Sequence, residues 1–140
     1  AEVYRKFDVG ERWNRKSAYK LLAYWLKRQP DLAFLAEHNG KIVGAFVAGI
    51  KPWWDGNHLV DGEIFIHPDY QKKGIGTELS VFMYKAALRK YKVARFDTFT
   101  FKNSKFPLSW YKSQGFEEVS EWTIISADLR KVLQIIGKNV

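Results

Sequence analysis

Cysteine is absent from the 140-residue chain, and histidine and methionine are rare, with three His and one Met. Without cysteine the protein has no disulfide, no thiolate zinc site and no cysteine nucleophile. The three histidines, His38, His58 and His67, do not combine into a pair with metal-ligand spacing on one helix face. We therefore expect no bound metal.

Long apolar runs are also missing. No segment approaches the roughly 20 consecutive apolar residues of a membrane-spanning helix. The start of the chain, residues 1–6, lacks the apolar region of a signal peptide. These absences predict a soluble protein of the cytoplasm with no membrane partner.

Charge of one sign is not concentrated anywhere, although 23 Lys and Arg outnumber 15 Asp and Glu and give a formal net charge of +8. Such an excess fits either contact with nucleic acid or attraction of a small anion. Because no run of about five like charges is present, nucleic acid is the less favoured partner.

The chain is rich in residues that build a core. Hydrophobic residues make up 46% of it and aromatic residues 16%, including six Trp. This composition excludes a disordered chain. Because the length suits one core and there is no repeat, linker or low-complexity tract, we expect a single domain over residues 1–140.

Helices are predicted where apolar residues recur every three or four positions. The firmest covers residues 74–90, whose apolar side chains share one face. Further helices are expected at residues 11–28, 107–113 and 129–136. Pro30 should end the first of these and Gly137 the last.

Strands are predicted where short β-rich runs are bounded by turn residues. They lie at residues 3–7, 31–37, 41–50, 59–67, 94–101 and 116–126, the last broken near Ser120 and Glu121. Asn39-Gly40 is a hairpin signal that pairs the second run with the third. Residues 51–57 are expected to form a loop, because they contain Pro52 and Asp55-Gly56. The mixture predicts an α/β fold of the α+β type.

One segment has the design of an anion-binding site. Residues 63–77 place a strand, a glycine-containing loop and a helix start in succession. The first N–H groups of a helix have no partner within it and lie at the positive end of its dipole, so a phosphate accepts several of them. Gly74 and Gly76 permit close approach of the phosphate, and Lys72 and Lys73 add positive charge.

A plain strand-to-helix turn is the alternative for this segment, because two glycines alone more often only shape such a turn. Two well-known phosphate motifs do not fit it. A P-loop is excluded because no G-x-x-x-x-G-K-[ST] motif is present, and the dinucleotide fingerprint fails because Leu79 replaces its third glycine. A phosphate ligand of another kind remains.

The sequence Gln71-Lys72-Lys73-Gly74-Ile75-Gly76 resembles the central signature of the GNAT superfamily of N-acetyltransferases, a strand followed by Q/R-x-x-G-x-G/A and a helix. A second element, which runs from Tyr111 to Gly115-Phe116, looks like the family's later Tyr-x-x-x-Gly-Phe. The resemblance implies a central, twisted, mostly antiparallel mixed sheet with splayed middle strands and helices on both faces. It also implies transfer of an acetyl group from acetyl-CoA to a primary amine by direct attack in a ternary complex.

The same resemblance assigns residues to the cofactor. The pyrophosphate would lie on the backbone of the loop, and the pantetheine arm would pair with the motif strand like an added strand. The residues implied are Ile64, Phe65, Ile66, Gln71, Lys72, Lys73, Gly74, Ile75, Gly76, Thr77 and Asn103. Asn103 departs from the family spacing, because it lies eight residues before Tyr111 and Ser104 occupies the expected seventh position.

Two residues are candidates for the proton transfers. An alkylamine with a pKa near about 10.4 is almost wholly protonated at neutral pH, so a base or a water path must remove a proton before attack. Glu63 on the motif strand is our candidate base, the alternative being an outward-facing or salt-bridged glutamate. The resemblance assigns protonation of the departing CoA thiolate to Tyr111, the alternative being an aromatic packing residue.

The sequence leaves the acceptor and two competing functions open. Adjacent indoles at Trp53 and Trp54, beside Asp55, would hold an ammonium group, although such residues more often cover a hairpin or an interface. A small polyamine or aminoglycoside-like amine and a protein amine both remain as acceptors. A catalytically silent CoA-binding regulatory module is the main alternative to an enzyme, and a nucleic-acid-associated protein is the third. The last predicted helix either seals the core or pairs with a second copy in a homodimer.

Overall fold

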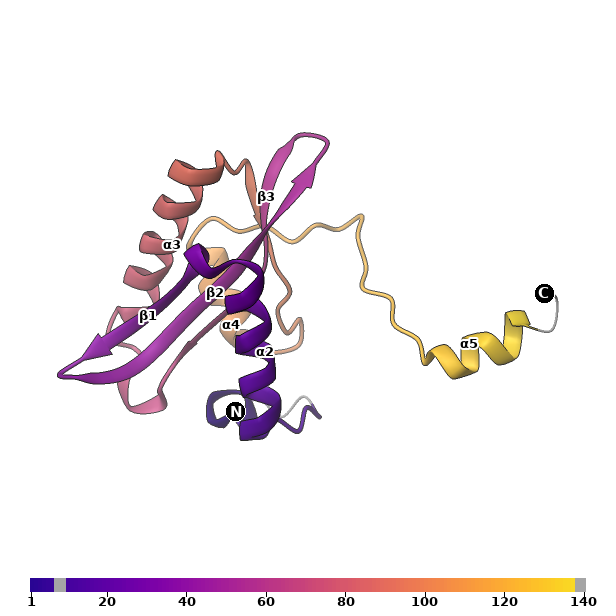
Figure 1. The fold of residues 1–140 in the computed structure, drawn as a ribbon, viewed down its shortest axis with the longest axis horizontal. Helices are drawn as coiled ribbons and strands as arrows, with labels where there is room; N and C mark the ends of the chain where they lie inside the picture. The colour runs from indigo at the N-terminus through magenta and orange to yellow at the C-terminus, as the bar shows by residue number, and fades with distance from the viewer. Residues whose placement is uncertain (7–9, 138–140) are drawn as a thin grey trace. The chain divides into compact units, whose positions relative to one another are not determined.

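The computed structural model describes residues 1–6 and 10–137 of the chain. Its contacts divide into two compact units, Ala1–Phe99 and Thr100–Val140. The first unit is a mixed sheet with helices, as Figure 1 shows, and the second contains two helices. The α/β class expected from the sequence is confirmed. Among the helices that the structure describes, none combines the length and apolarity that a membrane span requires.

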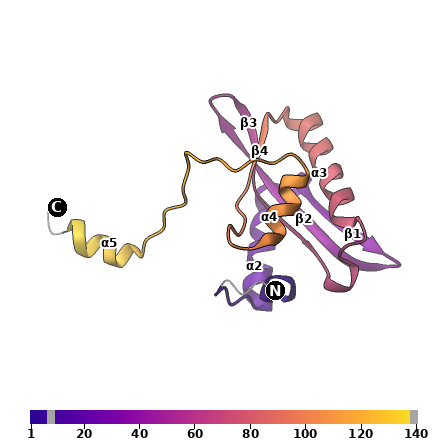
Figure 2. The ribbon, with the colours of Figure 1, turned by 180° about the vertical axis from the view of Figure 1, so that it is seen from behind.

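The sheet of the first unit has four strands, in the order β1 (Ala33–His38), β2 (Lys41–Trp53), β3 (Gly56–Ile66) and β4 (Arg95–Asp97). The first three pair antiparallel, and β4 runs parallel to β3. Figure 2 shows β4 beside β3 from behind. The sheet is therefore mixed and mostly antiparallel, as the resemblance implied.

The two antiparallel hairpins differ in how well the sequence predicted them. The hairpin at Asn39-Gly40 is confirmed, with φ of 50° and 74° at the two turn residues. The predicted loop at residues 51–57 is wrong, because Trp53 pairs with Gly56 and only Trp54 and Asp55 lie between the strands. Asp55-Gly56 therefore belongs to a tight hairpin turn instead of separating two elements.

Helix α2 (Arg15–Arg28) lies on one face of the sheet. The helix begins at Arg15, four residues later than predicted. Asn14 caps it and exchanges hydrogen bonds of 3.0 Å with Ser17. Trp25 is buried against Gly49 of β2, where a Cβ atom would lie 2.7 Å from the indole. The missing side chain at Gly49 thus makes room for the helix.

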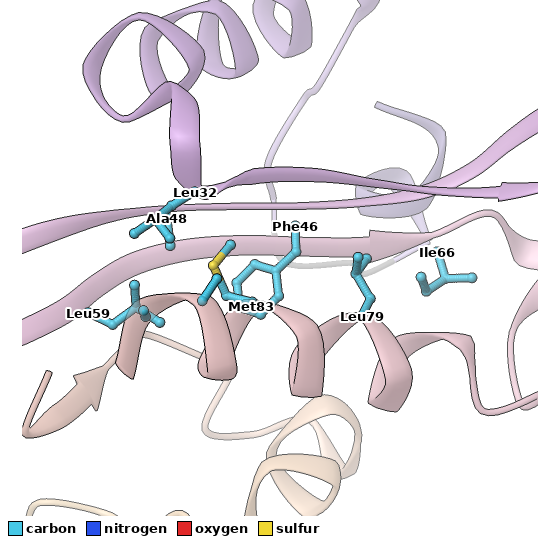
Figure 3. Packing of buried hydrophobic residues seen from close by; sticks show 9 residues of the cluster. Leu32, Phe46, Ala48, Leu59, Ile66, Leu79 and Met83 are labelled. Atoms are coloured by element: carbon cyan, nitrogen blue, oxygen red, sulfur yellow. The ribbon is translucent and has the colours of Figure 1, made fainter. Parts of the chain in front are cut away.

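Helix α3 (Ile75–Tyr91) covers the opposite face and confirms the firmest helix prediction. Figure 3 shows Leu79 and Met83 of α3 reaching the sheet beside Phe46 and Ile66. The cluster consists of Leu32, Phe46, Ala48, Leu59, Ile66, Leu79, Met83, Ala86 and Ala87. This core fixes the start of α3 relative to the end of β3.

The strand predicted at residues 3–7 is wrong for the part that the structure describes. Residues Glu2–Arg5 form the short helix α1, in which the amide of Arg5 donates to the carbonyl of Ala1 at 3.0 Å. A strand needs a neighbour to satisfy its backbone, whereas a helical turn satisfies its own. The seventh residue lies outside the described residues.

A β-bulge interrupts β3 just before Glu63. Gly49 pairs with Val60 and Val47 with Glu63, so β3 carries one residue more than β2 in this interval. Asp61, which lies within this interval, has a left-handed φ of 50°. Because side chains alternate along a strand, the bulge turns Glu63 toward the α2 face, away from the core.

β3 and β4 pair only in the part of β3 that precedes the bulge. β4 pairs with β3 only at His58, Leu59 and Val60. Beyond the bulge, among the described residues, no strand pairs with that side of β3. The predicted strand at residues 94–101 is therefore cut to Arg95–Asp97, and its pairing with β3 ends at Val60.

The second unit contains α4 (Lys105–Ser113) and α5 (Leu129–Ile136). Both were predicted, although α4 begins two residues early with an irregular Phe106 at φ −104° and ψ 137°. Gly137 ends α5 as expected. The strand predicted at residues 116–126 is wrong, since these residues form no strand ladder and contain only a turn at Ser120-Glu121. High β-propensity without a strand partner does not produce a strand.

Candidate functional site

The loop between β3 and α3 is shaped by its own hydrogen bonds. It begins with a 3₁₀ turn, Pro68–Tyr70, shortly after the end of β3. The Gln71 side-chain amide then donates to the carbonyl of Ile66 at 2.9 Å and ties the loop to the end of β3. Lys72 adopts a left-handed φ of 60°, a conformation that most residues avoid. The loop is therefore held in a defined conformation at the start of α3.

The first turn of α3 has the features of an anion site. Its N-cap residue is Gly74, with φ of 82° and no side-chain cap. The first amide hydrogen bond within this turn runs from Glu78 to the Gly74 carbonyl at 3.0 Å, so the preceding amides are available to a ligand. A Cβ atom built at Gly74 meets nothing within 4 Å, which leaves open space in front of the turn.

Positive side chains lie at the same turn. Lys72, Lys73 and Thr77 are exposed. The Lys73 ammonium lies 5.3 Å from the centre of the Tyr70 ring, within the range of a cation–π contact. The geometry thus provides open amides, a dipole end and two lysines for a phosphate.

The last three residues of β3 combine a packed face with an unpaired edge. Ile66 is buried in the core, while Ile64 and Phe65 are half-buried. One edge of this stretch pairs with β2, and among the described residues no strand pairs with the other. The Ile66 carbonyl accepts from Gln71 at 2.9 Å, and the other outward-facing backbone groups of this edge suit a peptide-like chain that adds as a strand.

Glu63 lies in a small pocket on the α2 face of the sheet. The pocket has a volume of about 70 Å³, well below the roughly 300 Å³ at which sites for whole drug-sized ligands begin. It is lined by Ala1, Val3, Tyr4, Trp13, Ala18, Leu21, Leu22, Glu63 and Phe65. Glu63 is the only side-chain carboxyl among the described residues of this lining, so the pocket presents one carboxylate among apolar and aromatic groups.

The surroundings of Glu63 change its acidity. Burial raises the pKa of its carboxyl above the ordinary value of 4.5, and the nearby charges of Glu11 and Asp61 raise it further. The Tyr4 hydroxyl donates a hydrogen bond to Oε2 of Glu63 and opposes the rise. A carboxylate with a raised pKa is a stronger base than an exposed one.

The predicted acceptor residues lie at the other end of the β2–β3 hairpin. Trp53 pairs with Gly56 at the turn, whereas Glu63 pairs with Val47. Gly56 and Glu63 are seven positions apart along β3, or roughly 23 Å at about 3.3 Å per residue. Trp54 is 88% exposed. The structure therefore does not bring the two indoles together with Glu63, and their role as an acceptor site stays a prediction.

Asp55, the third predicted acceptor residue, is already bonded to a buried histidine. Its Oδ1 lies 2.8 Å from Nε2 of His58, and Oδ2 of Asp97 lies 2.5 Å from Nδ1. A doubly protonated imidazole satisfies both carboxylates. Burial opposes the charged ring, but the bonds to Asp97 and Asp55 prevail and raise the pKa of His58 above 6.5. Among the described residues, no cluster of His, Asp or Glu has the arrangement of a metal site.

Tyr111 and Asn103 belong to the second unit. Tyr111 lies on α4 and is buried, with its ring 5.0 Å from that of Trp110 and 5.1 Å from that of Phe116. Asn103 lies in the turn that Ser104 closes by donating its amide to the carbonyl of Phe101 at 3.3 Å. The aromatic packing explains how the tyrosine ring is held within its unit, and the roles of both residues stay predictions.

Sequence reasoning missed two contributors to the site. Tyr4 lies 59 residues from Glu63, and nothing local marks it as a partner. The bulge at Asp61-Gly62 had a weak signal, because a glycine inside a strand pattern suggests a bulge or a close approach. The close approach is present at Gly62, where a Cβ atom would lie 2.7 Å from the Phe46 ring.

Comparison with known families and sequences gives two findings. Residues 2–116 match the family described as the acetyltransferase (GNAT) family. An uncharacterised N-acetyltransferase of Methanocaldococcus jannaschii is 32% identical, over 96% of this chain and 59% of the relative. The chain therefore spans 59% of the length of that archaeal protein.

Solved structures with the same fold include acetyltransferases. One is a predicted acetyltransferase from Clostridium acetobutylicum that was solved with acetyl-CoA. Its TM-score is 0.67 at 18% identity, and the match covers 88% of this chain and 83% of the Clostridium chain. Another is glucosamine-6-phosphate N-acetyltransferase from Arabidopsis thaliana, with a TM-score of 0.61 at 13% identity. This match covers 91% of this chain and 88% of the Arabidopsis chain. At these identities the similarity establishes the fold.

Proposed function

The chain belongs to the acetyltransferase (GNAT) family, and from this premise we propose that it transfers an acetyl group from acetyl-CoA to a primary amine. The observation that carries the proposal is the uncapped start of α3 beside the unpaired edge of β3. These two features suit the two parts of CoA, the pyrophosphate and the peptide-like pantetheine arm. A structural neighbour from Clostridium acetobutylicum was solved with acetyl-CoA, which supports this choice of ligand.

The cofactor residues divide into two groups by chemistry. The amides from Gly74 to Thr77 bind the pyrophosphate, with Lys72 and Lys73 neutralising its charge. Gln71 holds the loop to Ile66 through its 2.9 Å hydrogen bond and thereby sets the position of the phosphate site relative to β3. The free edge at Ile64, Phe65 and Ile66 pairs with the pantetheine amides. An amide near Ile66 polarises the thioester carbonyl and stabilises the developing oxyanion.

Glu63 acts as the general base in this mechanism. The incoming ammonium gives up one proton to the carboxylate, and the neutral nitrogen then attacks the thioester carbon. A C–N bond forms, the C–S bond breaks, and the electron pair of that bond leaves with the CoA sulfur. The attacking nitrogen then loses its second proton to solvent, and solvent returns a proton to Tyr111 after the tyrosine has protonated the thiolate. The raised pKa of Glu63 supports this assignment, because it brings the base closer to the working pH.

Tyr111 supplies the proton that the departing thiolate takes up. This assignment rests on the match of Tyr111, Gly115 and Phe116 to the family's Tyr-x-x-x-Gly-Phe element. The products are an N-acetyl amine and CoA with a free thiol, and the transfer proceeds in a ternary complex without a covalent enzyme intermediate. Asn103 is a weaker candidate for a cofactor contact because of its one-residue offset.

The first experiment is calorimetric titration of the purified protein with acetyl-CoA, followed by a CoA-thiol release assay over a panel of amines and peptides. We expect binding of acetyl-CoA and release of thiol with at least one acceptor. Absence of acetyl-CoA binding would overturn the proposal. Binding without transfer across the panel would instead favour a regulatory CoA-binding module.

Glu63→Gln tests the base separately. The substitution keeps the size of the side chain and removes its basicity, so kcat/KM should fall by about 100-fold or more while acetyl-CoA affinity stays unchanged. Glu37→Gln, an exposed position at the end of β1, is the matched control. Full activity of the Glu63→Gln variant would exclude Glu63 as the base and leave a water path.

A further inference from the structure

Tyr4 joins the N-terminal helix to the candidate base. Its hydroxyl donates a hydrogen bond to Oε2 of Glu63, and its ring lies 5.7 Å from that of Trp13 at an angle of 49°. All three residues line the same pocket. We propose that Tyr4 is a positioning residue that orients the Glu63 carboxylate and stabilises its charged form. The inference rests on the proposed function, in which Glu63 is the base.

The electrostatic setting gives Tyr4 a distinct role. Three titratable groups among the described residues act on Glu63: Tyr4 from α1, Glu11 from the segment before α2, and Asp61 from β3. Burial and the two carboxylates favour the neutral carboxyl, which cannot accept a proton from an amine. The hydroxyl of Tyr4 favours the anion, because a donated hydrogen bond stabilises the charged oxygen. Tyr4 therefore keeps the base ionised at a lower pH than its pocket alone would allow.

The same hydrogen bond divides the two carboxylate oxygens between two tasks. The Tyr4 hydrogen bond takes one acceptor site of Oε2, which leaves Oε1 as the less occupied oxygen for the proton from the acceptor ammonium. Trp13 packs on the Tyr4 ring and restricts its movement. The base is thereby held in one orientation, as efficient proton transfer requires.

The test measures the titration of Glu63 directly. Carbon-13 NMR of the labelled glutamate carboxyls, with the Glu63 signal assigned by its loss in Glu63→Gln, gives the pKa in wild type and in Tyr4→Phe. We expect a rise of about one pH unit or more in Tyr4→Phe. Tyr19→Phe is the matched control, since it removes a hydroxyl from a ring of α2 that is 73% exposed, and it should leave the titration unchanged. An unchanged Glu63 pKa in folded Tyr4→Phe overturns the inference.

A second variant moves the titration in the opposite direction. Site-specific replacement of Tyr4 by 3-fluorotyrosine makes the hydroxyl a stronger donor and should lower the pKa of Glu63. This outcome does not depend on the tolerance of the site to phenylalanine. The proposed role of Tyr4 is contradicted if 3-fluorotyrosine leaves the pKa of Glu63 unchanged or shifts it in the same direction as Tyr4→Phe.

Kinetics then connect the titration to catalysis. The acidic limb of kcat/KM should move to higher pH in Tyr4→Phe by the same amount as the NMR titration, with little change in rate well above the limb. If the NMR shift occurs and Glu63→Gln keeps full activity, the coupling of Tyr4 to Glu63 stands and the base assignment fails. If Glu63→Gln is inactive and no NMR shift occurs, the base assignment stands and the role of Tyr4 fails.

Discussion

His58 of β3 and Asp97 of β4 are joined by a hydrogen bond of 2.5 Å between Nδ1 and Oδ2. The other ring nitrogen lies 2.8 Å from Asp55 in the β2–β3 turn. One buried imidazole therefore links three elements at the only place where β3 and β4 pair among the described residues. This link lies next to the unpaired edge of β3 along which the pantetheine arm is proposed to lie.

Stability should fall as the pH rises through the pKa of His58. Because the folded-state pKa lies above the ordinary value of 6.5, the protonated form contributes stability that is fully present below pH 6.5 and is lost as the pH passes the folded value. Urea unfolding between pH 6 and 9 measures this loss. His58→Gln should unfold more easily at pH 6, by about 1–3 kcal/mol, and should lack this component of the pH dependence.

The double variant Asp55→Asn/Asp97→Asn is the control for the cause of that shift. It keeps the imidazole and removes both negative charges, so the free energy of unfolding should change less between pH 6 and 9 than in the wild type. A full pH dependence in this variant would show that other groups produce it.

Gly62→Ala should destabilise the protein by about 1–3 kcal/mol. A Cβ atom there would lie 2.7 Å from the Phe46 ring and 3.0 Å from the Phe96 ring, both packed in the first unit. Thermal or urea unfolding measures the effect. Gly137→Ala is the matched control, because a Cβ there meets nothing within 4 Å and φ is −68°. Equal stability of the two variants would contradict the close packing at the bulge.

Thr77→Asp should weaken acetyl-CoA binding by about tenfold or more without lowering stability. The added carboxylate lies in the first turn of α3, where it repels a phosphate and yet favours the helix dipole by about 0.3–1 kcal/mol. Calorimetric titration and thermal unfolding separate the two effects. Thr77→Asn, a neutral variant of similar size, should retain most of the affinity. Unchanged affinity in Thr77→Asp would exclude this turn as the pyrophosphate site.

Tyr111→Phe should lower kcat by about 100-fold while acetyl-CoA affinity stays within about twofold of wild type. The phenyl ring keeps the contacts with Trp110 and Phe116, so the variant removes mainly the proton donor. Steady-state CoA release and calorimetry provide the two measurements. Tyr19→Phe should behave as wild type in both. An unchanged kcat in Tyr111→Phe would assign the residue to packing alone.

Local patterns were sufficient for the elements whose structure depends on nearby residues. Residues 74–90 carry a helical apolar face, and Asn39-Gly40 favours left-handed turn geometry, so α3 and the first hairpin were predictable. Local patterns failed at residues 116–126, where β-rich composition predicted a strand and none forms. Strand formation depends on a partner elsewhere in the chain, and no local pattern reports whether one is present.

The sequence by itself determined the family and the α3 loop, because the motif from Gln71 to Gly76 is contiguous and its backbone chemistry depends on the helix start that follows. Only the tertiary structure decided the environment of Glu63. One extra residue in β3 turns its side chain to the α2 face, and a tyrosine 59 residues away then bonds to it. The face of a strand residue depends on register, and the pKa of a carboxyl depends on burial and on distant partners, so both are properties of the folded chain.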